Sequence, residues 1–398
     1  MRGAVLLLIT IAFAGAEQLP PWTEGTLDIH HISTGRGNST LFVLPDGTTM
    51  LVDAGAARDG IPETAQHPDG NRTPGAWIAR YLARRGVTAL DYAVITHFHP
   101  DHMGTFSSSA QTDASGAYKL SGITEVGSAI PIHTLLDRGW PDYAYPSVMK
   151  DDTLQNYRKF SEAHKEMKTE AFTAGSSKQI VLRKNAAAYP KFEVRNIVVN
   201  GNVWTGAGDA TRALFPPVAN LAQADLPTEN MCSLGFRLQY GAFRYFTGGD
   251  LPGTADPGIP AWHALEPAIA QSIGKVDVHA VNQHGSMGEE SEEFLKTLQS
   301  TVLVVPSWAP SHPAPDVLKR IMNSRFAPNP RHVFVTDLRE AARIVIGQRA
   351  TQLAGPPGHI VVRVDRGGGS YRVYVLDYRD EKDTVLAEKG PFASSGGN

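Results

Sequence analysis

The sequence contains a single cysteine, Cys232, among 398 residues. One cysteine excludes an intramolecular disulfide, so the fold must be stabilised by its hydrophobic core and by any metal that it binds. Cys232 lies in an apolar stretch. We therefore expect a small buried side chain at this position rather than a metal ligand.

Excess charge of one sign is also scarce, because 37 lysines and arginines face 40 aspartates and glutamates, for a formal net charge of −3. So small a net charge produces no general attraction to nucleic acid or to anionic lipid. Basic residues do gather between residues 150 and 184, but acidic residues are interleaved with them. This pattern is typical of a solvated helix face, so nucleic acid remains an open partner that the charge pattern does not support.

Long apolar stretches are missing except near the N-terminus, where residues 5–13 are apolar. This stretch follows Arg2 and precedes Ala14-Gly15-Ala16, which is the pattern of a secretory signal peptide with its cleavage site. A short buried helix is the alternative interpretation, and nine residues are too few to cross a bilayer. We expect removal of residues 1–16 and a mature protein, residues 17–398, that is secreted or periplasmic and has no membrane span.

Strand and helix patterns mix along the whole chain with no clear linker, which indicates one α/β domain. A helix is expected at 74–85 and another at 314–325, and residues 147–171 are compatible with helix. Within about 106–176 we expect an insertion or cap, which begins with a Ser/Gly/Ala-rich loop at 106–128. Apolar and alternating stretches predict strands at residues 27–32, 40–44, 49–52, 90–96, 179–183, 192–199, 203–204, 233–240, 243–247, 277–281, 302–305, 333–336, 360–363 and 371–377.

The strongest local signal follows the strand at 90–96 and reads His97-Phe98-His99-Pro100-Asp101-His102. Imidazole and carboxylate groups are the preferred ligands of Zn, Mn and Fe. In an extended segment His97 and His99 project to the same side, and Pro100 then turns the chain. This spacing predicts two adjacent divalent cations, one held by His97 and His99 and the other by Asp101 and His102. Zn is the first expectation and Mn the alternative.

The segment THFHPDHMGT resembles the HxHxDH signature of the metallo-β-lactamase superfamily. Further ordered segments resemble the ComEC-type competence-protein subgroup of that superfamily: GRGNSTLFVLPDGTTMLVDAG, SLGFRLQYGAFRYFTGGDL, VDVHAVNQHGSMG and HPAPDVLKRI. Together the similarities extend from about residue 27 to about residue 320. The resemblance implies an αββα sandwich, in which two mixed β-sheets are flanked by helices.

The resemblance also implies roles for residues far from the motif. Asp250 corresponds to the aspartate that bridges the two metals, and His284 corresponds to a ligand of the second metal, beside Asp101. Asp53 corresponds to an aspartate that orients the ligand loop through hydrogen bonds. His312 corresponds to a histidine near the mouth of the site, where it would contact substrate or phosphate.

Three positions depart from the family pattern. The superfamily often has a histidine between the motif and the bridging aspartate, where this chain has Glu229-Asn230-Met231. We expect water or Asn230 to fill that position on the first metal. Gln283 stands where the subgroup often has a histidine, and Asn38 stands where it often has an aspartate.

A pair of divalent cations would activate water as a metal-bound hydroxide at neutral pH and would bind an anionic oxygen in the transition state. Asp101 or Asp250 would then act as the catalytic group that steers the water proton. The first hypothesis is therefore hydrolysis of a phosphodiester or phosphoester outside the cytoplasm. The alternatives are hydrolysis of carboxylic esters, lactones or thioesters, and a non-catalytic binding protein on the same fold. The sequence leaves the substrate and the oligomeric state open.

Overall fold

The computed structural model describes residues 17–398 except 59, 63, 256, 327–329 and 396–398. The signal peptide expected at residues 1–16 lies outside the described residues. Among the helices that are described, none has both the length and the apolar character needed to cross a membrane.

The strands form two mixed sheets, each with one parallel and one antiparallel part. The nine-stranded sheet has, in spatial order, β17 (Val385–Ala393), β16 (Ser370–Leu376), β15 (His359–Val364), β1 (Leu27–His31), β2 (Thr40–Val43), β3 (Thr49–Val52), β4 (Leu90–Val94), β5 (Ile132–Asp137) and β6 (Lys168–Ala171). The eight-stranded sheet has β14 (His332–Val335), β13 (Val302–Val305), β12 (Val278–Ala280), β11 (Phe243–Thr247), β10 (Gly235–Tyr240), β7 (Phe192–Val199), β8 (Asn202–Trp204) and β9 (Thr211–Ala213).

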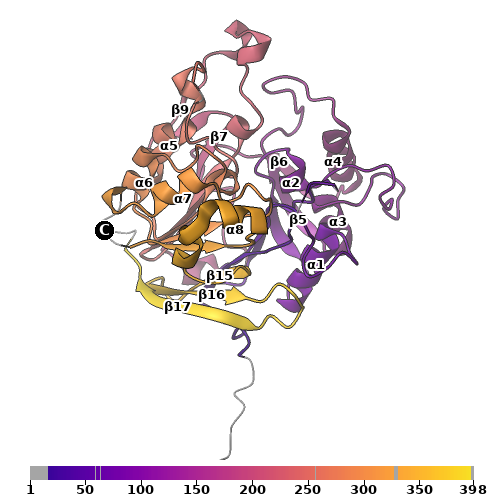
Figure 1. Ribbon diagram of the computed structural model, residues 1–398. Helices are drawn as coiled ribbons and strands as arrows, with labels where there is room; N and C mark the ends of the chain where they lie inside the picture. The colour runs from indigo at the N-terminus through magenta and orange to yellow at the C-terminus, as the bar shows by residue number, and fades with distance from the viewer. Residues whose placement is uncertain (1–16, 59, 63, 256, 327–329, 396–398) are drawn as a thin grey trace, which may run out of the picture.

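Helices cover the outer face of each sheet (Figure 1). The α-helices are α1 (Pro74–Arg84), α2 (Pro100–Met103), α3 (Ile123–Ala129), α4 (Asp152–Ala163), α5 (Leu265–Ile273), α6 (Glu292–Leu298), α7 (Pro315–Ile321) and α8 (Glu340–Ile346). Two short 3₁₀ helices, η4 (Asn230–Cys232) and η6 (Asn282–Gly285), belong to loops that matter below.

The core consists of layers, because each sheet is apolar on both faces. Between the sheets, Phe42 of β2 contacts Phe236 of β10 and Tyr245 of β11, with ring centroids 5.9 and 5.5 Å apart. On one outer side α1, α3 and α4 pack on the nine-stranded sheet, and on the other α5, α6 and α7 pack on the eight-stranded sheet. The fold class is therefore the expected one, two mixed sheets flanked by helices.

Helix α1 illustrates how local sequence produces these elements. Pro74 occupies the first turn, and the Thr73 hydroxyl accepts a hydrogen bond from the Ala76 N–H at 3.3 Å. Ile78 and Leu82 lie on the buried face, four residues apart, and pack on the sheet.

Several sequence expectations were wrong or incomplete. Residues 179–183 do not form a strand, since the N–H and C=O of Val181 pair with the hydroxyl of Tyr92 instead of another strand. Helix α7 ends at Ile321 rather than at 325. The segment 106–176, expected as an insertion or cap, contributes β5 and β6 to the nine-stranded sheet, so this part of it belongs to the main fold.

The topology places the functional loops at neighbouring sheet edges. β3, β4 and β5 are parallel, so their carboxyl ends meet at one edge, directly before Asp53 and before the histidine motif. β11, β12 and β13 are also parallel, and their carboxyl ends precede Asp250, His284 and His312. Both edges contribute side chains to one cluster.

Candidate metal centre

The first group of possible metal ligands consists of His97, His99 and Asp250. Nε2 of His97 lies 3.0 Å from Nδ1 of His99 and 3.7 Å from Oδ2 of Asp250. One donor atom from each of the three residues falls within 4.8 Å of the others. His97 is fully buried and His99 is partly exposed, so this group reaches from the interior to the surface.

The second group consists of Asp101, His102, Asp250 and His284, whose donor atoms also lie within 4.8 Å of one another. Nε2 of His284 is 3.1 Å from Oδ2 of Asp101. Nε2 of His102 is 3.1 Å from Oδ1 of Asp250. The structure thus brings all six predicted ligand residues together across about 190 positions of sequence.

Asp250 belongs to both groups, with Oδ2 toward His97 and Oδ1 toward His102. Oδ1 is buried, and among the described residues the His102 ring is the group that faces it at hydrogen-bonding distance; a buried carboxylate oxygen needs such a partner or a cation. Nε2 of His102 also faces Nε2 of His284 at 3.2 Å, so that two imidazole nitrogens converge on one point beside Asp101 and Asp250. Converging nitrogen and carboxylate donors of this kind fit two divalent cations such as Zn or Mn.

The protonation states of His97 and His102 depend on their burial and on the charges of their neighbours. Burial lowers the pKa of His97 well below its ordinary value, and the neighbouring His102 adds to this effect. Burial also opposes charge on His102, but Asp250 and Asp53 raise the pKa of His102 well above its ordinary value. In the metal-free protein a proton on His102 therefore balances the carboxylates, and a cation that binds there displaces this proton.

Asp53 orients His102, as the family resemblance implied. Oδ1 of Asp53 accepts the Thr96 N–H at 2.8 Å, and Oδ2 lies 2.9 Å from the Thr96 hydroxyl and 2.8 Å from Nδ1 of His102. A proton held on Nδ1 leaves Nε2 of His102 as the free donor for a cation. Asp53 has a φ of 59°, a left-handed conformation that aspartate and asparagine tolerate better than most residues.

His284 is oriented by the main chain. Its Nδ1 lies 3.0 Å from the carbonyl oxygen of Pro306 in the loop after β13, which leaves Nε2 directed at Asp101 and His102. His284 and the preceding Gln283 both have positive φ, 58° and 45°. This tight bend lets the short loop after β12 turn an imidazole back over the sheet edge.

Two glycines allow the backbone of the motif to pack closely. A Cβ on Gly55 would lie 1.8 Å from the carbonyl oxygen of Asp101, and one on Gly249 would lie 2.8 Å from Cβ of Thr96. The same Asp101 carbonyl accepts the N–H of Asn38 at 2.7 Å. Asn38, which departs from the family pattern, thus supports the ligand loop through its main chain.

Glu229 and Arg138 were not singled out by sequence. Oε1 of Glu229 accepts the Phe98 N–H at 2.7 Å, between the two histidines of the first group. Arg138 binds the same carboxylate through Nε at 2.7 Å and stacks its guanidinium over the Phe98 ring at 4.5 Å. Asn230 follows Glu229, and its Oδ1 is buried without a hydrogen-bond partner. Glu229 and Arg138 together therefore hold in place the main chain that carries His97 and His99.

His312 lies against the second group. Its ring stacks on that of His284, with centroids 5.0 Å apart and planes at 17°. Trp308, which sequence reasoning missed, meets both rings edge-on at 5.9 and 5.6 Å. Burial lowers the pKa of His312 to about 3, and the nearby His284 contributes, so this imidazole is neutral at pH 7.

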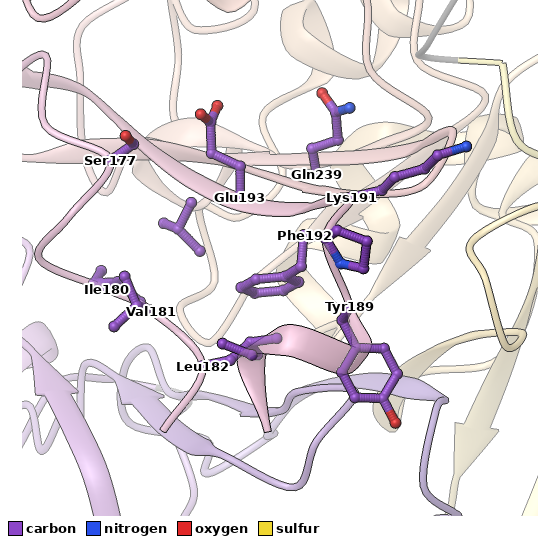
Figure 2. A pocket seen from close by; sticks show the side chains of 12 residues that line it. Ser177, Ile180, Val181, Leu182, Tyr189, Lys191, Phe192, Glu193 and Gln239 are labelled. Carbon is purple, nitrogen blue, oxygen red and sulfur yellow. The ribbon is translucent and has the colours of Figure 1, made fainter. Parts of the chain in front are cut away.

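A cavity of about 610 Å³ lies away from this cluster, between residues 177–194 and β10 (Figure 2). None of the predicted site residues lines it. Glu193 of β7 and Gln239 of β10, which are cross-strand partners, form part of its wall. The convergent donor atoms, rather than this cavity, mark the candidate site.

Comparison with known proteins finds a match for the segment that carries the histidine motif. The family model described as the metallo-beta-lactamase superfamily matches residues 32–111, the segment that contains Asp53 and the histidine motif. Among solved structures, a HARLDQ motif mutant of the metallo-beta-lactamase from Cronobacter sakazakii is similar at 13% sequence identity and a TM-score of 0.29, over 63% of this chain and 75% of that chain. No curated relative matches. Residues 32–111 thus match the metallo-β-lactamase superfamily, and the two mixed sheets with flanking helices are consistent with that fold.

Proposed function

We propose that this protein is a metal-dependent hydrolase that cleaves a phosphodiester or phosphoester. The observation that carries the proposal is Asp250, whose two oxygens face two separate donor groups. One group would hold a cation through His97 and His99, and the other through Asp101, His102 and His284. When bound, such cations acidify a water molecule and neutralise negative charge that develops on the substrate.

The chain's own carboxylates would manage the proton. Asp101 is the more exposed of the two, with 18% of its side chain accessible against 5% for Asp250. Burial opposes its ionisation, but the hydrogen bond with His284 and the charges of the cluster hold the pKa of Asp101 below its usual range. An ionised carboxylate on the more exposed side of the donor groups can accept a hydrogen bond from the water and so steer its proton, while the buried Asp250 fixes the two groups relative to each other.

Asn230 is our candidate for the ligand that replaces the missing histidine. Its chain neighbour Glu229 binds the Phe98 N–H, and Ser233 three residues on receives the Asp250 N–H at 3.3 Å. Asn230 thus lies in the chain between Glu229, which contacts the segment that carries His97 and His99, and Ser233, which contacts Asp250. Its buried amide oxygen without a partner is a neutral donor that Zn and Mn accept.

We further propose that the protein acts outside the cytoplasm. The support is the signal-peptide pattern of residues 1–16. Cys232, the last residue of η4, is fully buried in the core. The expected substrate is a small phosphoester, with nucleic acid as an open alternative.

The test is hydrolysis of bis-p-nitrophenyl phosphate by the full-length mature protein after chelation and after return of Zn or Mn. We expect chelation to abolish the activity and one of the metals to restore it. Asp250→Asn should remain inactive with either metal, whereas Asp142→Asn, at an exposed position, should behave as the wild type.

Inertness toward phosphoesters with both metals would overturn the proposal. Turnover of lactones, carboxylic esters or nitrocefin instead would assign the alternative hydrolase class. Fewer than one equivalent of metal after purification would assign a non-catalytic binding protein.

A further inference from the structure

Trp308 is an aromatic side chain with an unsatisfied polar atom beside the metal centre. It lies in the loop after β13, is 8% exposed, and packs edge-on against His284 and His312. Its indole Nε1 is buried and has no hydrogen-bond partner among the residues that the structure describes. A buried donor without a partner destabilises a fold, so its presence here requires an explanation.

Other buried tryptophans satisfy the same atom locally. Nε1 of Trp204 donates to the Gly208 carbonyl at 2.9 Å, and that of Trp77 donates to the Asp69 carbonyl at 3.0 Å. Both side chains are 8% exposed, as Trp308 is. An indole N–H can only donate, so what Trp308 lacks is an acceptor.

His312 presents a second unsatisfied atom at the same place. Its Nδ1 is buried and has no partner, and its ring is 6% exposed. Both rings contact His284, which belongs to the second donor group. Each of the two rings that pack on His284 thus carries a buried nitrogen without a partner among the described residues, and an oxygen of a bound ligand is a group that would satisfy it.

We propose that the indole N–H of Trp308 joins His312, whose contact with substrate or phosphate the family resemblance already implies, in binding an oxygen of the phosphoryl group of the substrate or product. This inference rests on the proposed function, because the second donor group is what brings a phosphoryl group to this position. The indole of Trp308 adds no charge, so it orients the anion by a hydrogen bond while the cations supply attraction. The pair would thus set the orientation of the group that is cleaved.

The probe is inorganic phosphate, titrated by calorimetry into the metal-loaded protein. Trp308→Phe keeps an aromatic ring and removes only the N–H, and loss of one hydrogen bond to a charged group should weaken phosphate binding by about 10- to 100-fold. The matched control is Trp204→Phe, an equally buried tryptophan whose N–H already has a partner, and it should bind phosphate as the wild type does. Metal content should be the same in all three proteins.

Stability without ligand gives an independent readout. Trp308→Phe removes an unpaired donor, so its unfolding temperature without phosphate should equal or exceed that of the wild type, and phosphate should raise it less. If Trp308→Phe does not fold, His312→Phe takes its place, since it keeps a stacked ring on His284 and removes Nδ1.

Unchanged phosphate affinity in the Trp308 variant, or equal weakening in the Trp204 control, would overturn the inference, even if phosphoester hydrolysis is intact. Absence of phosphate binding by the wild type would also overturn it. If the wild type binds phosphate through Trp308 but hydrolyses no phosphoester with Zn or Mn, the proposed function fails and this subsite stands.

Discussion

Replacement of Asp53 by asparagine should weaken metal binding without changing the ligands themselves. Asparagine tolerates the positive φ of this position as well as aspartate does, so the backbone conformation is retained. One amide oxygen can still accept the Thr96 N–H. The amide NH₂, however, replaces the oxygen that accepts from Nδ1 of His102.

The magnitude follows from the tautomer of His102. An NH₂ group opposite Nδ1 favours the tautomer that carries its proton on Nε2, and Nε2 is the atom that faces Asp250 and His284. The ligand must change tautomer before it can bind, and it loses the basicity that a carboxylate partner confers. Changes of this kind cost about 10- to 100-fold in metal affinity, which corresponds to about 1.4 to 2.8 kcal/mol.

The assay is competition of the protein with a chromophoric chelator for Zn. Asp46→Asn is the matched control, because Asp46 is also a buried carboxylate and accepts the backbone N–H groups of Thr48, Lys184 and Asn185 far from the site. Both variants should lose thermal stability in chelator, but only the Asp53 variant should lose metal affinity. Equal metal affinity of the Asp53 variant and the wild type would refute the orienting role.

Three further predictions concern other residues. Glu229→Gln should weaken binding of the cation at His97 and His99 by about tenfold and leave binding at the second group unchanged, because Glu229 holds the Phe98 main chain between these two ligands. A two-site metal titration measures both affinities, and equal weakening at the two sites would contradict the prediction. Burial, with the charge of Glu290, raises the pKa of Glu266 to about 8 from 4.5. Between these two pH values the folded protein keeps a proton on Glu266 that the unfolded chain has lost, so the free energy of unfolding should fall as the pH rises from about 4.5 to about 8. Urea titrations of Glu266→Gln should show a smaller fall over the same pH range, and an unchanged pH dependence would count against a raised pKa at Glu266. Burial raises the pKa of the Cys232 thiol to about 12, so a thiol reagent should label it at pH 8 only after unfolding, and rapid labelling of the native protein would be inconsistent with its buried position.

The motif could be read from sequence because its ligands are close together in the chain. His97, His99, Asp101 and His102 directly follow an apolar strand, and strand geometry alone predicts a shared side for the first two. Asp250 and His284 could be placed only by the family resemblance, since no local pattern connects them to the motif. The structure brings both within hydrogen-bonding distance of it.

The groups that orient the ligands were harder to predict. Pro306 acts through a carbonyl oxygen, which every residue possesses, and Glu229 acts on a main-chain N–H. Neither contact has a residue pattern that sequence reasoning could detect. Trp308 did offer a signal, a tryptophan in a Pro- and Ser-rich loop four residues before His312.

The missed parts of the fold have similar causes. β5 was not expected because the surrounding residues are rich in Ser, Gly and Ala, yet it pairs in parallel with β4. β17 is an exposed edge strand that contains Pro391, a residue that edge strands tolerate and that weakens any strand prediction. Ile180 and Leu182 are apolar because they pack into the core between the sheets, although residues 179–183 pair with no strand.

The most direct test of the account is anomalous scattering at the Zn and Mn absorption edges from crystals of the metal-loaded protein. Two peaks are expected, one bound by His97, His99 and Asp250 and the other by Asp101, His102, Asp250 and His284. A single peak without Asp250, or metal bound only elsewhere on the protein, would contradict the claim that these side chains form a two-metal centre.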